Sequence, residues 1–261
     1  MINPAVYLGA FGDNAPYELL VSRGSIPQAR PEGAYGRLVA AAGTTAQILW
    51  PDGAYNIPPA AGVQMSIVST SANDVATTGT GVRQVEMHYL DANLAEQVEV
   101  INMNGLTPVL TVATNVRFIQ CLHATLVGSL KTAAGTINCT NAGTLYALIS
   151  AGQSRCTSSA RMVPAGVYLY VEAMSAGSIS STADAQVEVE LVATELDAHQ
   201  YTDQGLFLSY GGVGLQSSSA SLRVGTPLRF SPGTIVAFRT STDKAATVFG
   251  TWFSHLEAIR T

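Results

Sequence analysis

The chain has 261 residues, of which 47% are hydrophobic and 12% are charged, against roughly 25% charged residues in an average soluble domain. Its net charge of −5 argues against sequence-independent binding to nucleic acid, which needs a basic stripe. No apolar run approaches the roughly 20 residues that cross a bilayer, and no secretory signal is visible at the start. We therefore expect a protein made and assembled in a cytoplasm, with no nucleic acid and no membrane among its partners.

The low charge also bears on association. Few charges on a surface this large leave little repulsion between neighbouring molecules. A soluble monomer of low charge is one interpretation, and an oligomer or a component of a larger lattice is the other. We favour the second.

Residues 1–60 hold more than half of the prolines in under a quarter of the chain. Because proline cannot donate to a sheet ladder, we expect an extended N-terminal arm that packs along a surface, with short extended pieces at 17–22 and 45–50. Few acidic residues lie near Arg23, Arg30 and Arg37, so the arm is locally basic. These three arginines are candidate interface residues.

From residue 63 onward the pattern predicts one strand after another. Asp91-Ala-Asn93 separates two strands, 82–90 and 96–101, and Asn104-Gly105 predicts a second hairpin turn, since both residues tolerate positive φ. We interpret this stretch as a β-meander. The run 116–127 is long and mostly apolar, which indicates a strand buried on both faces or bent between sheets. Residues 128–143 are rich in Gly, Thr and Asn and predict several turns.

A second group of predicted strands follows, at 144–150, 156–163, 167–174, 187–191, 204–210, 227–230, 234–239 and 246–256. Val187-Glu-Val-Glu-Leu191 alternates cleanly, which is typical of a sheet with one wet face. The fold class that we predict is all-β, a β-sandwich or jelly-roll-like fold behind the proline-rich N-terminal segment. Residues 61–261 form either one sandwich region or two sub-sheets or subdomains that divide near 128–143.

The last predicted strand is apolar on both faces. Phe249 and Phe253 share one face, and Val248, Trp252 and Leu256 share the other. This pattern fits a central core strand, and it also fits a strand covered by a neighbouring subunit. We therefore add Phe249, Trp252 and Phe253 to the candidate interface residues.

Enzyme motifs are absent from the sequence: there is no G-x-S-x-G elbow, no H-E-x-x-H and no P-loop. Glu188 and Glu190 share a strand face but are better explained as solubilising residues than as a catalytic pair. Cys121, His123 and Cys139 offer three metal ligands at most, without a fixed fourth. We predict no enzyme, with no catalytic residue, cofactor or metal, and three reduced, buried cysteines, Cys156 included.

Several segments of the meander resemble a family of virion structural proteins of tailed bacteriophages. The matching segments are Ser71-Ala-Asn-Asp74, Ala76, Gly79-Thr-Gly-Val-Arg83, Leu90-Asp-Ala-Asn93, Asn104-Gly-Leu-Thr-Pro-Val109, Asn115-Val-Arg-Phe-Ile119, Ile149-Ser-Ala-Gly-Gln-Ser154 and Val163-Pro-Ala-Gly166. The resemblance covers about residues 65–175 and departs from the family pattern at Asn102-Met103. It implies virion assembly rather than catalysis, and it rests on turn and strand residues.

On this basis our first hypothesis is a capsid decoration (cement) protein that sits on the outer face of a phage head. Its expected partners are the major capsid protein and further copies of itself, as a homotrimer, and its expected location is the virion. The alternative is a tail, baseplate or head-fibre component with a host- or glycan-binding role. A carbohydrate-binding module or glycan-active enzyme on a jelly roll is the hypothesis from a different class.

Overall fold

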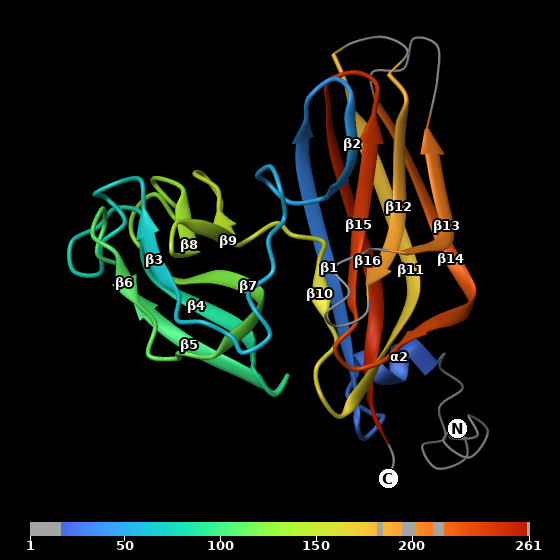
Figure 1. Cartoon of the computed structure of the whole chain (residues 1–261), viewed down its shortest axis with the longest axis horizontal. Helices are drawn as coiled ribbons and strands as arrows, with labels where there is room; N and C mark the ends of the chain where they lie inside the picture. The colour runs from blue at the N-terminus through green and yellow to red at the C-terminus, as the bar shows by residue number, and fades with distance from the viewer. Residues whose placement is uncertain (1–16, 182–184, 195–201, 211–216, 260–261) are drawn as a thin grey trace.

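The computed structural model describes residues 17–181, 185–194, 202–210 and 217–259, and within these ranges the fold is almost entirely antiparallel β-sheet (Figure 1). This confirms the all-β prediction. One short helix, α2 (Tyr17–Ser22), lies at one end of a large β-sandwich, and a smaller β lobe stands beside that sandwich. Within the described ranges no helix is long and apolar enough to span a membrane.

The large sandwich consists of two sheets. The first, which we call the open sheet, has the order β1-β16-β11-β14. The second, the covered sheet, has the order β10-β15-β12-β13, with β2 also paired to β15. The bounds are β1 (Ala29–Ala40), β2 (Thr44–Ile48), β10 (Arg161–Met162), β11 (Val167–Ile179), β12 (Val187–Thr194), β13 (Thr202–Tyr210), β14 (Ser217–Phe230), β15 (Ile235–Thr242) and β16 (Ala246–Ala258).

Alternating side chains from both sheets build the core of the sandwich. Val187, Val189 and Leu191 of β12 point inward, as the sequence pattern predicts, and pack with residues such as Phe238 and Trp252. The intervening Glu190 points outward and receives a hydrogen bond from Arg239 Nε at 2.8 Å. The period-2 pattern therefore places one apolar face inside and one polar face outside.

The small lobe is also built from two sheets, in the orders β6-β3-β8-β9 and β5-β4-β7. Its core contains buried residues from both sheets, including Met65, Val85 and Leu122. The bounds are β3 (Ser66–Ser69), β4 (Val82–Asp91), β5 (Glu96–Asn102), β6 (Val109–Leu110), β7 (Val116–Val127), β8 (Ile137–Asn141) and β9 (Thr144–Ile149).

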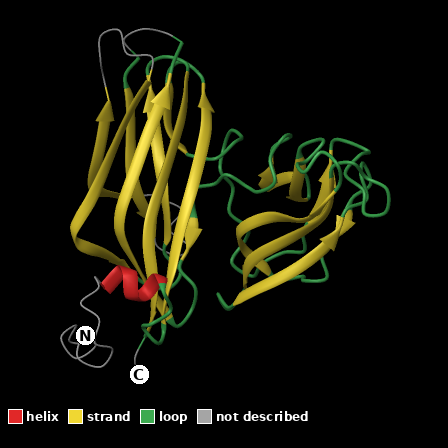
Figure 2. Ribbon diagram, turned by 180° about the vertical axis from the view of Figure 1, so that it is seen from behind, coloured by secondary structure: helices red, strands yellow, loops and turns green. Residues whose placement is uncertain are grey.

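An apolar cluster joins the two lobes. Leu90 and Phe118 of the small lobe pack with Val192, Ile235 and Ala237, which belong to β12 and β15 of the covered sheet. Because Phe118 lies in β7, this strand contributes to the small core and to the contact between the lobes. That double burial confirms the prediction from its continuous apolar run. Figure 2 shows the same side-by-side arrangement from behind.

The structure corrects the predicted arm over residues 1–60 wherever it describes them. Residues 29–40 form β1, which pairs along its full length with β16, and residues 17–22 are helical rather than extended. Pro31 is compatible with this strand because β1 lies at a sheet edge. The backbone N–H of Arg37 points away from β16 and donates to Thr157 O. By strand alternation the backbone nitrogen of Pro31 lies on the same side, so the ladder to β16 does not need an N–H at this position. Residues 1–16 lie outside the described ranges.

Two further predictions about chain organisation are wrong. The Asn104-Gly105 turn does not close a hairpin: β6, which follows it, pairs with β3 in the other small sheet, while β4 pairs with β5 and β7. The expected division near 128–143 is also displaced, since β8 and β9 remain with β3 and the chain returns to the sandwich only at β10. Local turn chemistry fixed where the chain turns, but not which strand it then meets.

Candidate functional site

The outer face of the open sheet carries a group of exposed apolar side chains. Three neighbouring strands place mostly small and apolar residues on this face. The residues are Gly33, Tyr35, Arg37 and Val39 of β1; Thr247, Phe249, Thr251 and Phe253 of β16; and Ala173, Ser175, Gly177 and Ile179 of β11. Among these twelve residues, Arg37 is the only charged one. Val39 is 68% exposed, Phe253 56% and Ile179 55%. Large apolar side chains gathered on one face mark an interaction surface more often than isolated ones do.

The register explains why the two phenylalanines stand out on this face. Phe253 lies between Gly33 on β1 and Ala173 on β11, and Phe249 lies between Arg37 and Gly177. Small neighbours on both sides leave the ring of Phe253 uncovered within its own chain. The candidate interface residues Phe249 and Phe253 therefore do share the outer face, as the alternation predicts.

Trp252, the third aromatic candidate, is not on this face. Its side chain is fully buried in the core of the sandwich, and its indole Nε1 donates a hydrogen bond to Ser159 O at 3.0 Å. The core interpretation of that side of β16 is therefore the right one, and Trp252 is corrected from an interface residue to a core residue. A buried indole with its N–H satisfied is a stable arrangement.

The three arginine candidates do not form one basic patch. Arg37 points outward from the open sheet beside Phe249, and Arg23 is exposed just after α2. Arg30 instead pairs with Glu96 of β5, across the boundary between the lobes. Positions 30 and 37 differ by an odd number, so their side chains leave β1 on opposite faces.

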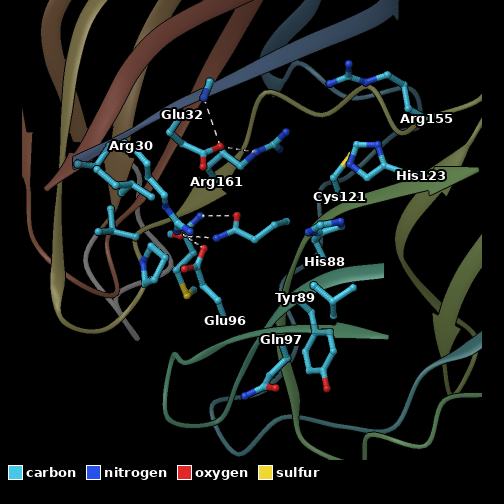
Figure 3. Close-up of a pocket in the computed structure, with 18 residues that line it drawn as sticks. Arg30, Glu32, His88, Tyr89, Glu96, Gln97, Cys121, His123, Arg155 and Arg161 are labelled. Carbon is cyan, nitrogen blue, oxygen red and sulfur yellow. Dashed lines mark hydrogen bonds and ion pairs between the residues drawn. The ribbon is translucent and has the colours of Figure 1, made fainter. Parts of the chain in front are cut away.

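A cleft of about 550 Å³ lies between the two lobes and is lined by residues of both. Figure 3 shows Arg30, Glu32 and Arg161 on the sandwich side, facing His88, Tyr89 and His123 on β4 and β7. This volume falls within the range of roughly 300–1,000 Å³ that is usual for ligand sites. The cleft is therefore a second candidate site.

Histidines and tyrosine give the cleft its electrostatic character. The rings of His88 and His123 are 5.2 Å apart and meet edge to face, and His88 Nε2 lies 2.6 Å from Glu86 Oε1. Burial lowers the pKa of His123, and the nearby His88 and Arg155 lower it further. Burial likewise raises the pKa of Tyr89. His123 is therefore held in its neutral form near pH 7.

The three cysteines are all buried, and they fall into two environments. Cys121 and Cys156 place their sulfurs 2.6 Å apart, whereas Cys139 is fully buried in β8, between β3 and β9. Cys121 and His123 both line the cleft, but Cys139 does not join them there. Within the described ranges, no group of three His, Cys, Asp or Glu side chains is placed to hold a metal ion.

The motif Ser71-Ala-Asn-Asp74 is explained by a buried carboxylate. Asp74 is fully buried and accepts hydrogen bonds from Ser69 Oγ (2.6 Å) and from the backbone N–H groups of Val82 (2.7 Å), Ala134 (2.9 Å) and Gly135 (2.9 Å). A side chain at Gly81 would place its Cβ 2.1 Å from Asp74 Oδ1. The acid and the glycine therefore organise the loops of the small lobe.

Sequence reasoning missed Tyr35, Val39 and Ile179 as surface residues. For Tyr35 and Val39, the alternation in Gly33-Ala-Tyr-Gly-Arg-Leu-Val39 could have indicated a strand with these two side chains on one face. The neighbouring prolines argued against a strand there. It also missed the closeness of Cys121 and Cys156, which only the packing of a long connection against β7 brings about.

No protein-family model matches the chain, and no curated protein matches its sequence. A search of solved structures finds a chain from a structure of the infectious bursal disease virus Gt strain, 10% identical over 95% of this chain and 83% of that one, with a TM-score of 0.21. A chain from the crystal structure of the T13 particle of that virus is 12% identical over 94% of this chain and 79% of that one, with a TM-score of 0.22. TM-scores this low support no conclusion about fold or function.

Proposed function

We propose that this protein is a non-enzymatic structural component of a tailed-phage particle, a capsid decoration (cement) protein that binds and stabilises the outer surface of the head. The observation that carries the proposal is the outer face of the open sheet, where Val39, Phe253 and Ile179 are exposed among mostly small, uncharged residues of β1, β16 and β11. The resemblance of residues 65–175 to phage virion proteins supports the virion as the location.

The dimensions of this face suit a subunit contact. Three strands about 4.8 Å apart, over about seven residues of 3.3 Å each, give roughly 330 Å². A standard protein interface buries about 800 Å² per partner, so a specific contact would use this face as its apolar centre and the surrounding surface as its rim. We assign it to the contact between copies of the chain in a homotrimer. Because a threefold contact is heterologous, the face meets a different surface of the next copy.

The major capsid protein is the second proposed partner. The exposed Arg23, at the end of the sandwich that carries α2, is a candidate contact with the shell. Arg30 is a poor candidate, because its side chain lines the cleft between the lobes. In this assignment the trimer contact is apolar and the shell contact is polar.

The direct test is to look for the chain in purified particles of the phage that encodes it. We expect mass spectrometry to find it as a stoichiometric component, and a virion reconstruction to place it as a trimer on the outer head surface. Its absence from particles that are otherwise complete would contradict the proposal. Its presence in the tail would replace decoration by the alternative below.

The interlobe cleft favours one alternative, a tail, baseplate or head-fibre component that binds a host glycan. Its volume of about 550 Å³ and polar lining residues, such as Gln97 and Arg155, fit a small polar ligand. A glycan-array screen with the wild-type chain and with Arg155→Ala tests it. Binding that depends on Arg155 would support this role, and no binding to any glycan would remove it.

A further inference from the structure

Two cysteines that are 35 residues apart in sequence meet in the structure. Cys121 belongs to β7, and Cys156 belongs to the connection that leaves the small lobe and leads to β10. The backbone N–H of Cys156 donates to Leu122 O at 2.9 Å, and His123 and Arg155 form an isolated antiparallel bridge next to it. This local pairing aligns the two side chains, and their sulfurs lie 2.6 Å apart.

The surroundings of the pair favour the thiolate form at Cys156, while the hydrogen bond with Cys156 and burial raise the pKa of Cys121. Hydrogen bonding from Cys121 lowers the pKa of Cys156, and the positive charge of Arg161 lowers it further. Cys121 lines the interlobe cleft (Figure 3), which is therefore the side from which a small solute would approach the pair. Cys139 is the contrasting case, because burial alone raises the pKa of its thiol. The thiolate is the reactive form of cysteine.

We propose that Cys121 and Cys156 are an oxidation site, at which a peroxide converts the two thiols into a disulfide that ties β7 to the connection between the lobes. One sulfur attacks the peroxide, so that an S–O bond forms and the O–O bond breaks, releasing water. The second sulfur attacks the resulting sulfenic acid, so that the S–S bond forms and the S–O bond breaks, releasing a second water. The two thiols lose two electrons and two protons, and hydrogen peroxide is reduced to two waters.

The crosslink acts on the part of the chain that enters the covered sheet. The connection that holds Cys156 continues through Ser159, whose backbone N–H donates to Leu49 O, and then into β10. Oxidation therefore fixes the path of the chain from the small lobe into the sandwich. This proposal does not rest on the function proposed above, since it concerns only the thiols and their surroundings.

The first experiment treats the folded, reduced wild-type protein with hydrogen peroxide and then counts thiols under denaturing conditions. We expect the count to fall from three to one, the three being Cys121, Cys139 and Cys156. The intact mass should fall by about 2 Da, because a disulfide forms by loss of two hydrogens. A non-reducing peptide map should contain a Cys121–Cys156 linked pair. Three remaining thiols, a mass gain from added oxygen, or a crosslink that includes Cys139 would overturn the proposal.

The second experiment compares Cys121→Ser and Cys156→Ser with the matched control Cys139→Ser. Oxidised wild type and Cys139→Ser should melt roughly 5–10 °C above their reduced forms, because the disulfide closes a long loop. Dithiothreitol should reverse the shift, and neither of the other two variants should show it. An equal shift in all of them would assign the effect to another oxidation and contradict the proposal. If a serine variant fails to fold, the peptide map of the wild-type protein still shows whether Cys121 and Cys156 form the disulfide.

Discussion

The two outer faces of the large sandwich differ in what covers them. On the covered sheet, Val192, Ile235 and Ala237 are buried beneath Leu90 and Phe118 of the small lobe. On the open sheet, Val39, Ile179 and Phe253 are all more than half exposed. Both faces carry apolar residues, but within the described chain only those of the covered sheet are buried by the small lobe.

This difference shows how one sandwich can serve two kinds of contact. The apolar area on the covered sheet stabilises the folded chain, since it is removed from water during folding. The apolar area on the open sheet gains that stabilisation only when another surface covers it. The open face should therefore contribute to association, and the covered face to the stability of the single chain.

The largest effect should come from removing the carboxylate that holds the covering lobe together. Asp74→Ala leaves four donors without their acceptor, so we expect a loss of about 4 kcal/mol or more in the free energy of unfolding. Urea denaturation measures it. Asp91→Ala is the matched control: Asp91 Oδ1 accepts only two backbone hydrogen bonds, from Asn93 and Ala95, in a β-turn, and its loss should cost about 1 kcal/mol. Equal losses would contradict the central role of Asp74.

A comparison of two phenylalanines tests the two faces directly. Phe118→Ala should lower the free energy of unfolding by about 3–5 kcal/mol, because it opens a cavity in the contact between the lobes. Phe253→Ala should alter the melting temperature only in a manner that depends on protein concentration, since its ring is 56% exposed in the single chain. If Phe253→Ala destabilised the protein equally at every concentration, the face would be part of the monomer's own stability.

The cleft side of the small lobe should respond to pH. Burial holds the pKa of His123 below its unfolded value of about 6.5, so the unfolded chain takes up a proton first as the pH falls. The free energy of unfolding should therefore decrease from pH 7 to pH 5, and it should decrease less in His123→Gln. Denaturation curves at the two pH values measure this, and an identical pH dependence in both proteins would contradict it.

The smallest effect should come from the ion pair that crosses the lobe boundary. The side chains of Arg30 and Glu96 are 50% and 45% exposed, so solvent screens their attraction. Removing either one should cost no more than about 1 kcal/mol. A double-mutant cycle with Arg30→Ala and Glu96→Ala isolates the interaction. A coupling much larger than this would mean that charge, rather than the cluster around Phe118, holds the lobes together.

Local patterns in the sequence predicted the elements better than their partners. The apolar run 116–127 and the alternation around Val187 gave β7 and the inner face of β12 correctly, because burial on each face leaves a periodic mark. The same reasoning failed for β1, whose one proline, Pro31, is tolerated because the strand lies at a sheet edge. It failed also at Asn104-Gly105, where the turn leads into a different sheet.

The candidate surfaces were predictable to a similar, partial extent. Alternation placed Phe249 and Phe253 on one side of β16, but it could not tell which side faces the core, so Trp252 was included with them. The cleft, the thiol pair and the separation of Arg30 from Arg37 all depend on long-range packing. The pattern of residues along the sequence does not indicate which distant segments come into contact.

Sedimentation of a charged variant of the open sheet tests the central claim most directly. In Phe253→Arg a charge is placed in the middle of the apolar face, while Val112→Arg places the same charge at another exposed apolar position, 88% exposed on the small lobe. We expect the wild type and Val112→Arg to sediment as trimers, and Phe253→Arg to sediment as a folded monomer with an unchanged circular dichroism spectrum. A wild type that is monomeric at all concentrations, or a Phe253→Arg variant that remains trimeric, would contradict the assignment of this face.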